Sequence, residues 1–362
     1  MIRRLGRERR EASVPTERRG ERPEPVSDGL DNRPWAGQAC GKVILLGEHA
    51  VVYGIPAIAV GIDRGARARA APIDDSFSRL HVRGWNISVD EREEETPPGH
   101  DLGKAFRALL NEVRADSPEF ATHSIEVEAN LPPGGGLGCS AAVGVAIARA
   151  IDPGASQDAV QRRAMAWERV FHGNPSGVDA AVAARGGCVF FKRGEALERV
   201  FARGALHLCI GSSGCASSTK TMVDAVAAMR ARCPEVVTRA FDGIGALVDD
   251  ARAAIEQGDR FALGRLMDLN QLLLGRLFVS TPEIERMCAL ARGAGAFGAK
   301  LTGAGGGGSV VALVSSELVS DAVLTAWSLE GFDGFATSVA LEMRPRVQEN
   351  EKLIETNLES AP

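Results

Sequence analysis

The 362-residue chain lacks several features that would place it in a specialised class of protein. It contains no apolar run near the roughly 18–20 residues that a membrane-spanning helix needs, and no apolar signal-peptide core follows its N-terminal arginines. Basic residues are not in excess, since 42 lysines and arginines stand against 47 aspartates and glutamates. The composition therefore predicts neither a nucleic-acid nor a membrane partner.

Paired cysteines are lacking as well. The seven cysteines occur singly, without a C-x-x-C pair and without a histidine spacing that suits zinc. This pattern excludes the common zinc motifs and favours a protein of the reducing cytoplasm.

The remaining composition is that of a globular enzyme. Hydrophobic residues make up 45% of the chain and charged residues 25%, which is enough to build a real core. At roughly 100–200 residues per domain, the length suggests two domains. The 41 glycines raise the question of whether the backbone approaches a ligand closely.

Both ends of the chain are predicted to be tails. Residues 1–34 are rich in arginine and glutamate and almost free of large apolar side chains, which favours disorder over a basic membrane-binding arm. Residues 346–362 are equally unanchored. Between them, strand-like and helix-like segments alternate, which predicts an α/β or α+β protein. We expect an N-terminal domain over residues 35–200 and a C-terminal domain over residues 201–345.

Hydrophobic periodicity and turn residues give the expected elements. The predicted strands are residues 38–46, 57–70, 80–89, 124–129, 188–192, 206–211, 296–301, 309–314 and 337–342. The predicted helices are residues 102–113, 140–150, 156–171 and 318–329, with a helical turn at 50–53 and a mainly helical stretch over 217–292.

A glycine-rich segment near the C-terminus does not fit a dinucleotide site. Gly303, Gly305 and Gly308 match the G-x-G-x-x-G spacing, but a strand-like run follows where a helix is required. No glycine-rich loop is followed by the lysine of G-x-x-x-x-G-K-[ST]. The chain is therefore not a P-loop protein.

A second glycine-rich segment, residues 131–142, lies between a predicted strand and a predicted helix. Its backbone N–H groups and the helix dipole would together create an anion site. Ser140 could instead act only as the residue that caps the helix N-terminus. The segment by itself leaves a phosphate site and a plain helix start equally open.

Two further segments, residues 41–54 and 168–179, place charged groups where they need partners. Lys42 lies in an otherwise apolar strand, and an unpaired buried ammonium is costly. Glu168 and Asp179 stand on either side of a tight turn. Two carboxylates and a lysine suit metal binding with proton abstraction, but they also suit plain structural pairing.

Together the four segments resemble the GHMP kinase superfamily. The N-terminal motif of that superfamily is similar to G-K-V-I-L-L-G-E-H-A-V-V at residues 41–52, its phosphate loop to residues 132–142, and its C-terminal motif to K-L-T-G-A-G-G-G-G at residues 300–308. The sequence H-G-N-P-S-G-V-D at residues 172–179 resembles the version in the branch that phosphorylates mevalonate, rather than the galactokinase or homoserine kinase versions. The resemblance covers about residues 36–345.

The resemblance implies an α+β fold with two domains. The N-terminal half would be like ribosomal protein S5 domain 2, the C-terminal half would be ferredoxin-like, and the active site would lie between them. The implied reaction transfers a phosphoryl group from ATP, with Mg²⁺, to the 5-hydroxyl of (R)-mevalonate in isoprenoid synthesis. Another GHMP kinase, such as one acting on phosphomevalonate, and a non-catalytic metabolite sensor are the alternatives. A homodimer is one expected assembly.

The resemblance also implies roles for individual residues. The ATP phosphates would be wrapped by Gly134, Gly135, Gly136, Leu137, Gly138, Cys139 and Ser140. Ser140 and Glu168 would hold the magnesium ion. Asp179 would take the proton of the substrate hydroxyl, and Lys42 would stabilise Asp179 and the developing oxyanion. Glu48, His49 and Thr302 would lie on the substrate side, although a structural hydrogen bond is an equally open role for His49.

One residue departs from the superfamily pattern. The superfamily usually has two serines after G-L-G, and Cys139 replaces the first of them here. If the magnesium ligand is the second serine, Ser140 preserves it and Cys139 is a small packed neighbour. Residues 217–220, S-S-T-K, also resemble a segment that some relatives place near the phosphates.

Overall fold

The computed structural model describes residues 30, 33–92, 101–132, 134–173, 175–201 and 204–341. Most of the two predicted tails lies outside these residues. Leu30, which we had assigned to the N-terminal tail, is buried. Leu30 therefore packs against the rest of the protein, whereas Arg33 and Pro34 are exposed.

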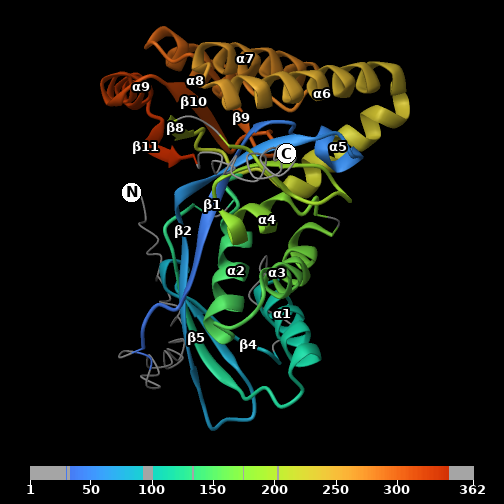
Figure 1. Ribbon diagram of the computed structural model, residues 1–362, viewed down its shortest axis with the longest axis vertical. Helices are drawn as coiled ribbons and strands as arrows, with labels where there is room; N and C mark the ends of the chain where they lie inside the picture. The colour runs from blue at the N-terminus through green and yellow to red at the C-terminus, as the bar shows by residue number, and fades with distance from the viewer. Residues whose placement is uncertain are drawn as a thin grey trace, which may run out of the picture.

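The N-terminal part of the chain builds a sheet covered on one side by helices (Figure 1). Among the described residues the strand order is β4-β3-β5-β2-β6-β7, with β1 paired to β2. The strands are β1 (Gly37–Leu46), β2 (Ala57–Pro72), β3 (Arg79–Val82), β4 (Ile87–Asp90), β5 (His123–Ala129), β6 (Cys188–Phe191) and β7 (Glu198–Arg199). The helices are α1 (Leu102–Asp116), α2 (Cys139–Ile151), α3 (Gln157–His172) and α4 (Val178–Arg185), and η1 (Ala50–Tyr53) and η2 (Arg83–Trp85) are short 3-10 turns.

Helix α2 is the centre of this half. Its residues are almost all small and apolar, and they are buried around nearly the whole circumference of the helix. Small side chains let α2 lie between the β1–β2 strands on one side and α3 on the other. Because α2 is enclosed in this way, the glycine-rich segment that precedes it is held against the sheet.

The C-terminal part forms a second sheet with the order β11-β8-β10-β9 in the described residues. Its strands are β8 (Ala205–Ser212), β9 (Gly298–Thr302), β10 (Ser309–Val314) and β11 (Asp333–Ala340). Its helices are α5 (Thr219–Arg232), α6 (Pro234–Gln257), α7 (Arg260–Arg276), α8 (Pro282–Gly293) and α9 (Glu317–Leu329). Neighbouring strands are antiparallel, and the chain order is strand, helices, strand, strand, helix, strand. This is the ferredoxin-like arrangement, and the expected α+β class is confirmed.

The structure differs from the predicted elements in several places. Strand β7 was not predicted, and β11 begins at Asp333 instead of residue 337. The strand expected over residues 80–89 is two strands separated by η2, because the chain turns back at Asn86, which has a positive φ of 50°. Helix α4 was not predicted, since its alanine-rich sequence is too short to show a helical period. We keep a domain boundary near residue 200 as a proposal, and it falls between β7 and β8.

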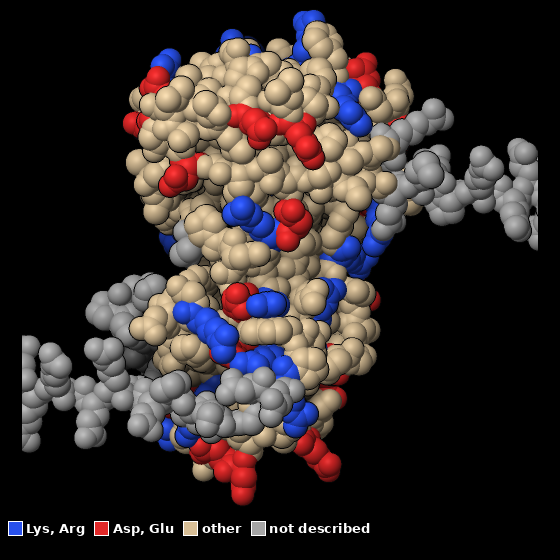
Figure 2. Space-filling model, turned by 90° about the vertical axis from the view of Figure 1, so that its left-hand side faces the viewer, with Lys and Arg blue, Asp and Glu red and all other residues tan. Residues whose placement is uncertain are grey.

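The other face of the N-terminal sheet carries charged side chains of both signs. Figure 2 shows basic and acidic groups interspersed over the lower half of the molecule on this side. Arg67 pairs with Glu128, and Arg69 and Arg83 both pair with Glu126. This face therefore presents paired charges instead of a continuous basic field.

Candidate active site

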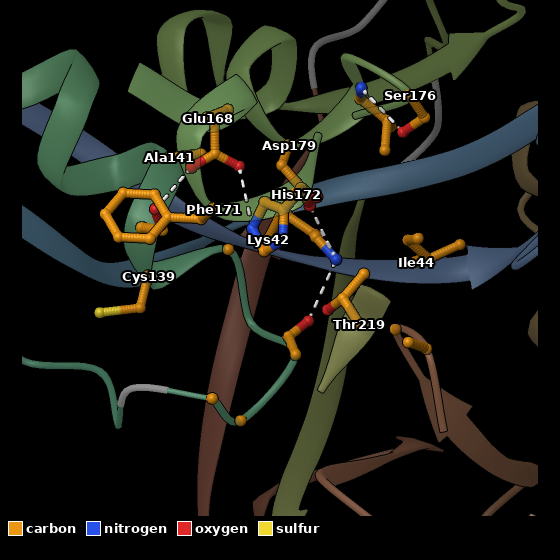
Figure 3. A pocket seen from close by; sticks show the side chains of 18 of the residues that line it. Lys42, Ile44, Cys139, Ala141, Glu168, Phe171, His172, Ser176, Asp179 and Thr219 are labelled. Carbon is orange, nitrogen blue, oxygen red and sulfur yellow. Dashed lines mark hydrogen bonds and ion pairs between the residues drawn. The ribbon is translucent and has the colours of Figure 1, made fainter. Parts of the chain in front are cut away.

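A cavity of about 670 Å³ lies where the two sheets meet. Its walls come from β1, the glycine-rich loop before α2, helices α2 to α5, and the turn at residues 303–304. Residues from all four sequence motifs thus reach one cavity, which is shown from close by in Figure 3.

Lys42 and Asp179 form an ion pair in this cavity. The Lys42 Nζ lies 2.8 Å from Asp179 Oδ1 and donates a hydrogen bond of 3.0 Å to the carbonyl of Gly136 (Figure 3). Lys42 comes from the middle of β1, whereas Asp179 lies in the first turn of α4. Burial lowers the pKa of Lys42 to about 8, although the carboxylates of Glu48 and Glu168 act in the opposite direction.

The glycine-rich loop is tied closely to the strand that carries Lys42. The backbone N–H of Lys42 donates to the carbonyl of Leu137 at 2.9 Å, and the Leu137 side chain is buried in the core. Gly138 precedes α2 with a φ of 72°, and a Cβ atom there would lie 2.9 Å from the Lys42 side chain. A residue with a side chain would therefore be strained at this position and would also push against Lys42.

Ser140 and Glu168 meet beside this pair. The Ser140 hydroxyl donates to Glu168 Oε1 at 2.6 Å and accepts a hydrogen bond of 3.1 Å from the indole N–H of Trp167. The helix has no side-chain cap, so the alternative of Ser140 as a mere N-cap is excluded. Glu168 Oε2 lies 3.5 Å from His172 Nε2. Burial raises the pKa of Glu168, and this increase is partly offset by His172, Ser140 and Lys42, which lower the pKa.

Glu48 and His49 lie at the end of β1, near the C-terminal half. Glu48 lines the cavity but is buried against Lys300, with which it forms an ion pair, and it accepts a hydrogen bond of 3.1 Å from Asn270 Nδ2. His49 has a φ of 60°, and its Nε2 lies 2.7 Å from the carbonyl of Ala304. Because a carbonyl only accepts, Nε2 carries the proton. Burial lowers the pKa of His49.

Cys139 is part of the cavity wall, whereas Thr302 and Leu137 lie outside it. Thr302 and Leu137 do not line the cavity, and the Thr302 hydroxyl accepts a hydrogen bond of 2.8 Å from the backbone N–H of Ile44. Thr302 therefore ties β9 to β1. Cys139 is buried at the cavity wall, where its thiol donates to the carbonyl of Leu131 at 3.4 Å. Burial raises the pKa of Cys139 to about 12, so it stays a neutral thiol.

The segment at residues 217–220 reaches the cavity in part. Ser218 caps α5 by accepting from the N–H of Thr221, and Thr219 lines the cavity. Lys220 is exposed and pairs with Asp224 at 2.6 Å. Of this segment, only Thr219 is brought to the site.

Several lining residues were not found from the sequence. His172 had a visible signal, since it lies four residues after Glu168 on the same helix. The apolar lining residues had none, because they come from separate elements: Trp85, Ile87, Leu102 and Phe171. Trp167 also lines the cavity.

Comparison with known proteins agrees with this geometry. Residues 102–187 match the family described as GHMP kinases N terminal domain, and residues 251–333 match GHMP kinases C terminal. These matches define the class as a GHMP kinase.

Individual relatives narrow the class further. A mevalonate kinase of Pyrococcus abyssi is 33% identical over 322 residues, covering 84% of this chain and 95% of the relative. A mevalonate kinase of Methanothermobacter thermautotrophicus is 36% identical over 281 residues, covering 76% of this chain and 89% of the relative. A crystal structure of L. major mevalonate kinase with R-mevalonate superposes with a TM-score of 0.71 at 27% identity, covering 89% of this chain and 99% of that one. The chain belongs to the mevalonate kinase family of GHMP kinases.

Proposed function

We propose that the protein transfers the γ-phosphoryl group of ATP to the 5-hydroxyl of (R)-mevalonate, giving 5-phosphomevalonate and ADP. The observation that carries this proposal is the Lys42–Asp179 ion pair, which faces the glycine-rich loop and the Ser140–Glu168 pair within one cavity. Phosphoryl transfer depends mainly on positioning and on neutralising charge, and this arrangement supplies both.

Asp179 is the group that accepts the proton of the substrate hydroxyl. Its side chain is one-third exposed and borders the cavity, so a hydroxyl can reach it. The adjacent Lys42 ammonium orients the carboxylate and stabilises negative charge on the attacking oxygen. As the O–H bond breaks, its proton moves to Asp179 and the oxygen forms the new bond to the γ-phosphorus, while the bond from that phosphorus to the bridging oxygen breaks and its electron pair leaves with ADP.

The glycine-rich loop and the start of α2 hold the ATP phosphates. Four of the loop residues that line the cavity are glycines, so backbone N–H groups can approach phosphate oxygens without steric hindrance from side chains. The positive end of the α2 dipole adds to this attraction. The aromatic side chains in the lining, Trp85 and Phe171, suit the flat adenine ring.

The donor set at Ser140 and Glu168 fits Mg²⁺. Among the described residues no group of three or more His, Cys, Asp or Glu side chains could hold a metal by itself. Mg²⁺ usually binds through one or two carboxylates together with substrate phosphates, which matches one carboxylate and one hydroxyl beside a phosphate loop. When bound, the ion neutralises charge on the β- and γ-phosphates.

The charge of the cavity favours an acceptor without a phosphate. In the part of the chain that the structure describes, Lys42 is the single lysine or arginine among the lining residues, and it is already paired. A phosphorylated acceptor would need further cations. Mevalonate, with one carboxylate, fits this cavity better than phosphomevalonate does.

The remaining parts of the proposal concern partners and location. No helix within the described ranges combines the length and apolar character needed to cross a bilayer. We propose a cytoplasmic enzyme that binds neither membranes nor nucleic acid and that assembles as a homodimer. The paired charges on the open sheet face support the absence of a nucleic-acid partner.

A coupled assay of ADP release tests the function. The substrates compared are mevalonate, phosphomevalonate, galactose and homoserine, each with MgATP. We expect turnover with mevalonate alone and its loss in Asp179→Asn. Preference for phosphomevalonate would indicate a sister kinase. ATP binding without turnover of any of the four would indicate a sensor.

A further inference from the structure

The Ser140 hydroxyl makes two hydrogen bonds of different kinds. It lies 2.6 Å from Glu168 Oε1 and 3.1 Å from the indole nitrogen of Trp167. An indole N–H can only donate, and a carboxylate oxygen accepts. The hydroxyl must therefore accept from Trp167 and give its single proton to Glu168.

This assignment determines what remains on the hydroxyl oxygen. A serine hydroxyl has one proton and two lone pairs. Trp167 uses one lone pair and Glu168 takes the proton, so one lone pair is left for a ligand in the cavity that Ser140 lines. Without the indole donor, the hydroxyl could rotate and lose this single orientation.

We propose that Trp167 is a positioning residue for the metal site: its indole N–H orients the Ser140 hydroxyl so that a lone pair, and not the proton, faces the magnesium ion of bound MgATP. The inference rests on the proposed function, which makes Ser140 and Glu168 the metal ligands. Trp167 acts through Ser140, because its single N–H group is already used by the Ser140 hydroxyl.

The packing of Trp167 supports this role. The side chain is fully buried, and it directly precedes Glu168 on α3. It lies against Gly144 of α2, where a Cβ atom would be only 2.9 Å from the indole ring. The indole is thus held in one position between the two helices that supply the ligands.

The test measures binding of Mn²⁺, as a substitute for Mg²⁺, to the full-length enzyme with ADP by electron paramagnetic resonance. Trp167→Phe keeps an aromatic ring but cannot donate. We expect its Mn²⁺ dissociation constant to rise about tenfold. This is the lower end of the loss in metal affinity that follows when a metal ligand loses the hydrogen-bond partner that orients it. Saturating metal should restore most of the turnover. A benzothienylalanine at position 167 keeps the bicyclic shape without the N–H and should behave in the same way.

Trp327 offers a matched control. It is also fully buried, and its indole N–H donates to the carbonyl of Met287 at 2.9 Å in the C-terminal half. Trp327→Phe should lower the melting temperature but leave the Mn²⁺ dissociation constant unchanged. An equal loss of Mn²⁺ affinity in this control would show that the effect is general destabilisation and would overturn the inference.

A double mutant separates action through Ser140 from other effects. In a Ser140→Ala background, Trp167→Phe should cause no further loss of Mn²⁺ affinity. A full additional loss there, or unchanged affinity in both Trp167 variants, would refute the inference. If the wild type itself bound no Mn²⁺ with ADP, the metal assignment would be wrong as well, whereas the substrate assay tests mevalonate phosphorylation independently.

Discussion

Replacement of Lys42 by methionine separates a catalytic lysine from one that only holds the fold. Lys42 is 3% exposed, and burial lowers its pKa from 10.5 to about 8. A shift of this size corresponds to about 3 kcal/mol by which the folded protein, compared with water, disfavours the charged lysine relative to the neutral one. The protein thus retains a buried charge that reduces its own stability.

The magnitude follows from what the substitution removes. Lys42→Met keeps a long side chain and eliminates the cost of the buried charge. The Oδ1 atom of Asp179 is buried and loses its partner, although the Asp179 side chain as a whole is one-third exposed to water. Because loss of the ion pair offsets part of the gain, we expect the free energy of unfolding at pH 7 to rise by about 1–3 kcal/mol. Turnover should fall by about 10²–10³-fold, as for the loss of an oxyanion-stabilising donor.

The pH dependence of the free energy of unfolding gives an independent test of the cost of the Lys42 charge. Between pH 8 and 10.5 the unfolded chain keeps the Lys42 proton while the folded protein has lost it, so stability increases with pH across this window. Below pH 8 both states are protonated and the full cost is present. The stability advantage of Lys42→Met should therefore be largest below pH 8 and shrink as the pH approaches 10.5.

The assay is urea denaturation of both proteins at pH 7 and pH 10, together with turnover per folded molecule. Lys104→Met is the matched control, because Lys104 is exposed and pairs with Asp101 at 3.0 Å away from the cavity. It should change neither stability nor turnover by more than a small amount. A lower melting temperature for Lys42→Met at pH 7, with turnover preserved, would refute the reasoning and make the pair structural.

Three further predictions follow from the site and from the chain end. Asp179→Asn cannot accept a proton, so turnover should fall by about 10²–10⁴-fold with little change in ATP or mevalonate binding. The double mutant with Lys42→Met should lose much less turnover than the product of the two single losses. A folded Asp179→Asn enzyme with near wild-type turnover would contradict the assignment. Gly138→Val should abolish ATP binding, because the φ of 72° and the contact with Lys42 leave no room for a side chain; circular dichroism checks the fold, and native nucleotide affinity in a folded variant would remove the loop from the site. Deletion of residues 1–28 should leave turnover and melting temperature nearly unchanged, because this segment has little apolar surface and the deletion spares buried Leu30; a large loss of either would show that the segment docks on the body.

Elements with a clear local pattern were predicted well. The continuous apolar run of β10 and the small apolar residues of α2 lie where the sequence pattern placed them. Helix α4 and the break at η2 were missed, because each depends on a few residues whose conformation is set by contacts and turns. The resemblance to a superfamily supplied the roles of Lys42 and Asp179, but the residues alone left a salt bridge equally open.

Tertiary contacts also changed the meaning of single residues. Thr302 belongs to a motif that suggested the substrate side, yet its hydroxyl joins β9 to β1. Glu48 forms a buried pair with Lys300, which lies 252 positions away in the chain. No local pattern could have indicated that pairing, because it arises only where the two halves meet.

The sequence by itself determined the alternation of strands and helices, the glycine-rich loop before α2 and the charged residues that chemistry would need, because these follow from periodicity, turn residues and short motifs within single segments. The resemblance to a superfamily then selected the α+β class. Only the tertiary structure decided which of those residues share a cavity, how deeply Lys42 is buried, and that Trp167 donates to Ser140. Distances and burial depend on packing between distant segments, and a pattern within one segment carries no information about its neighbours in space.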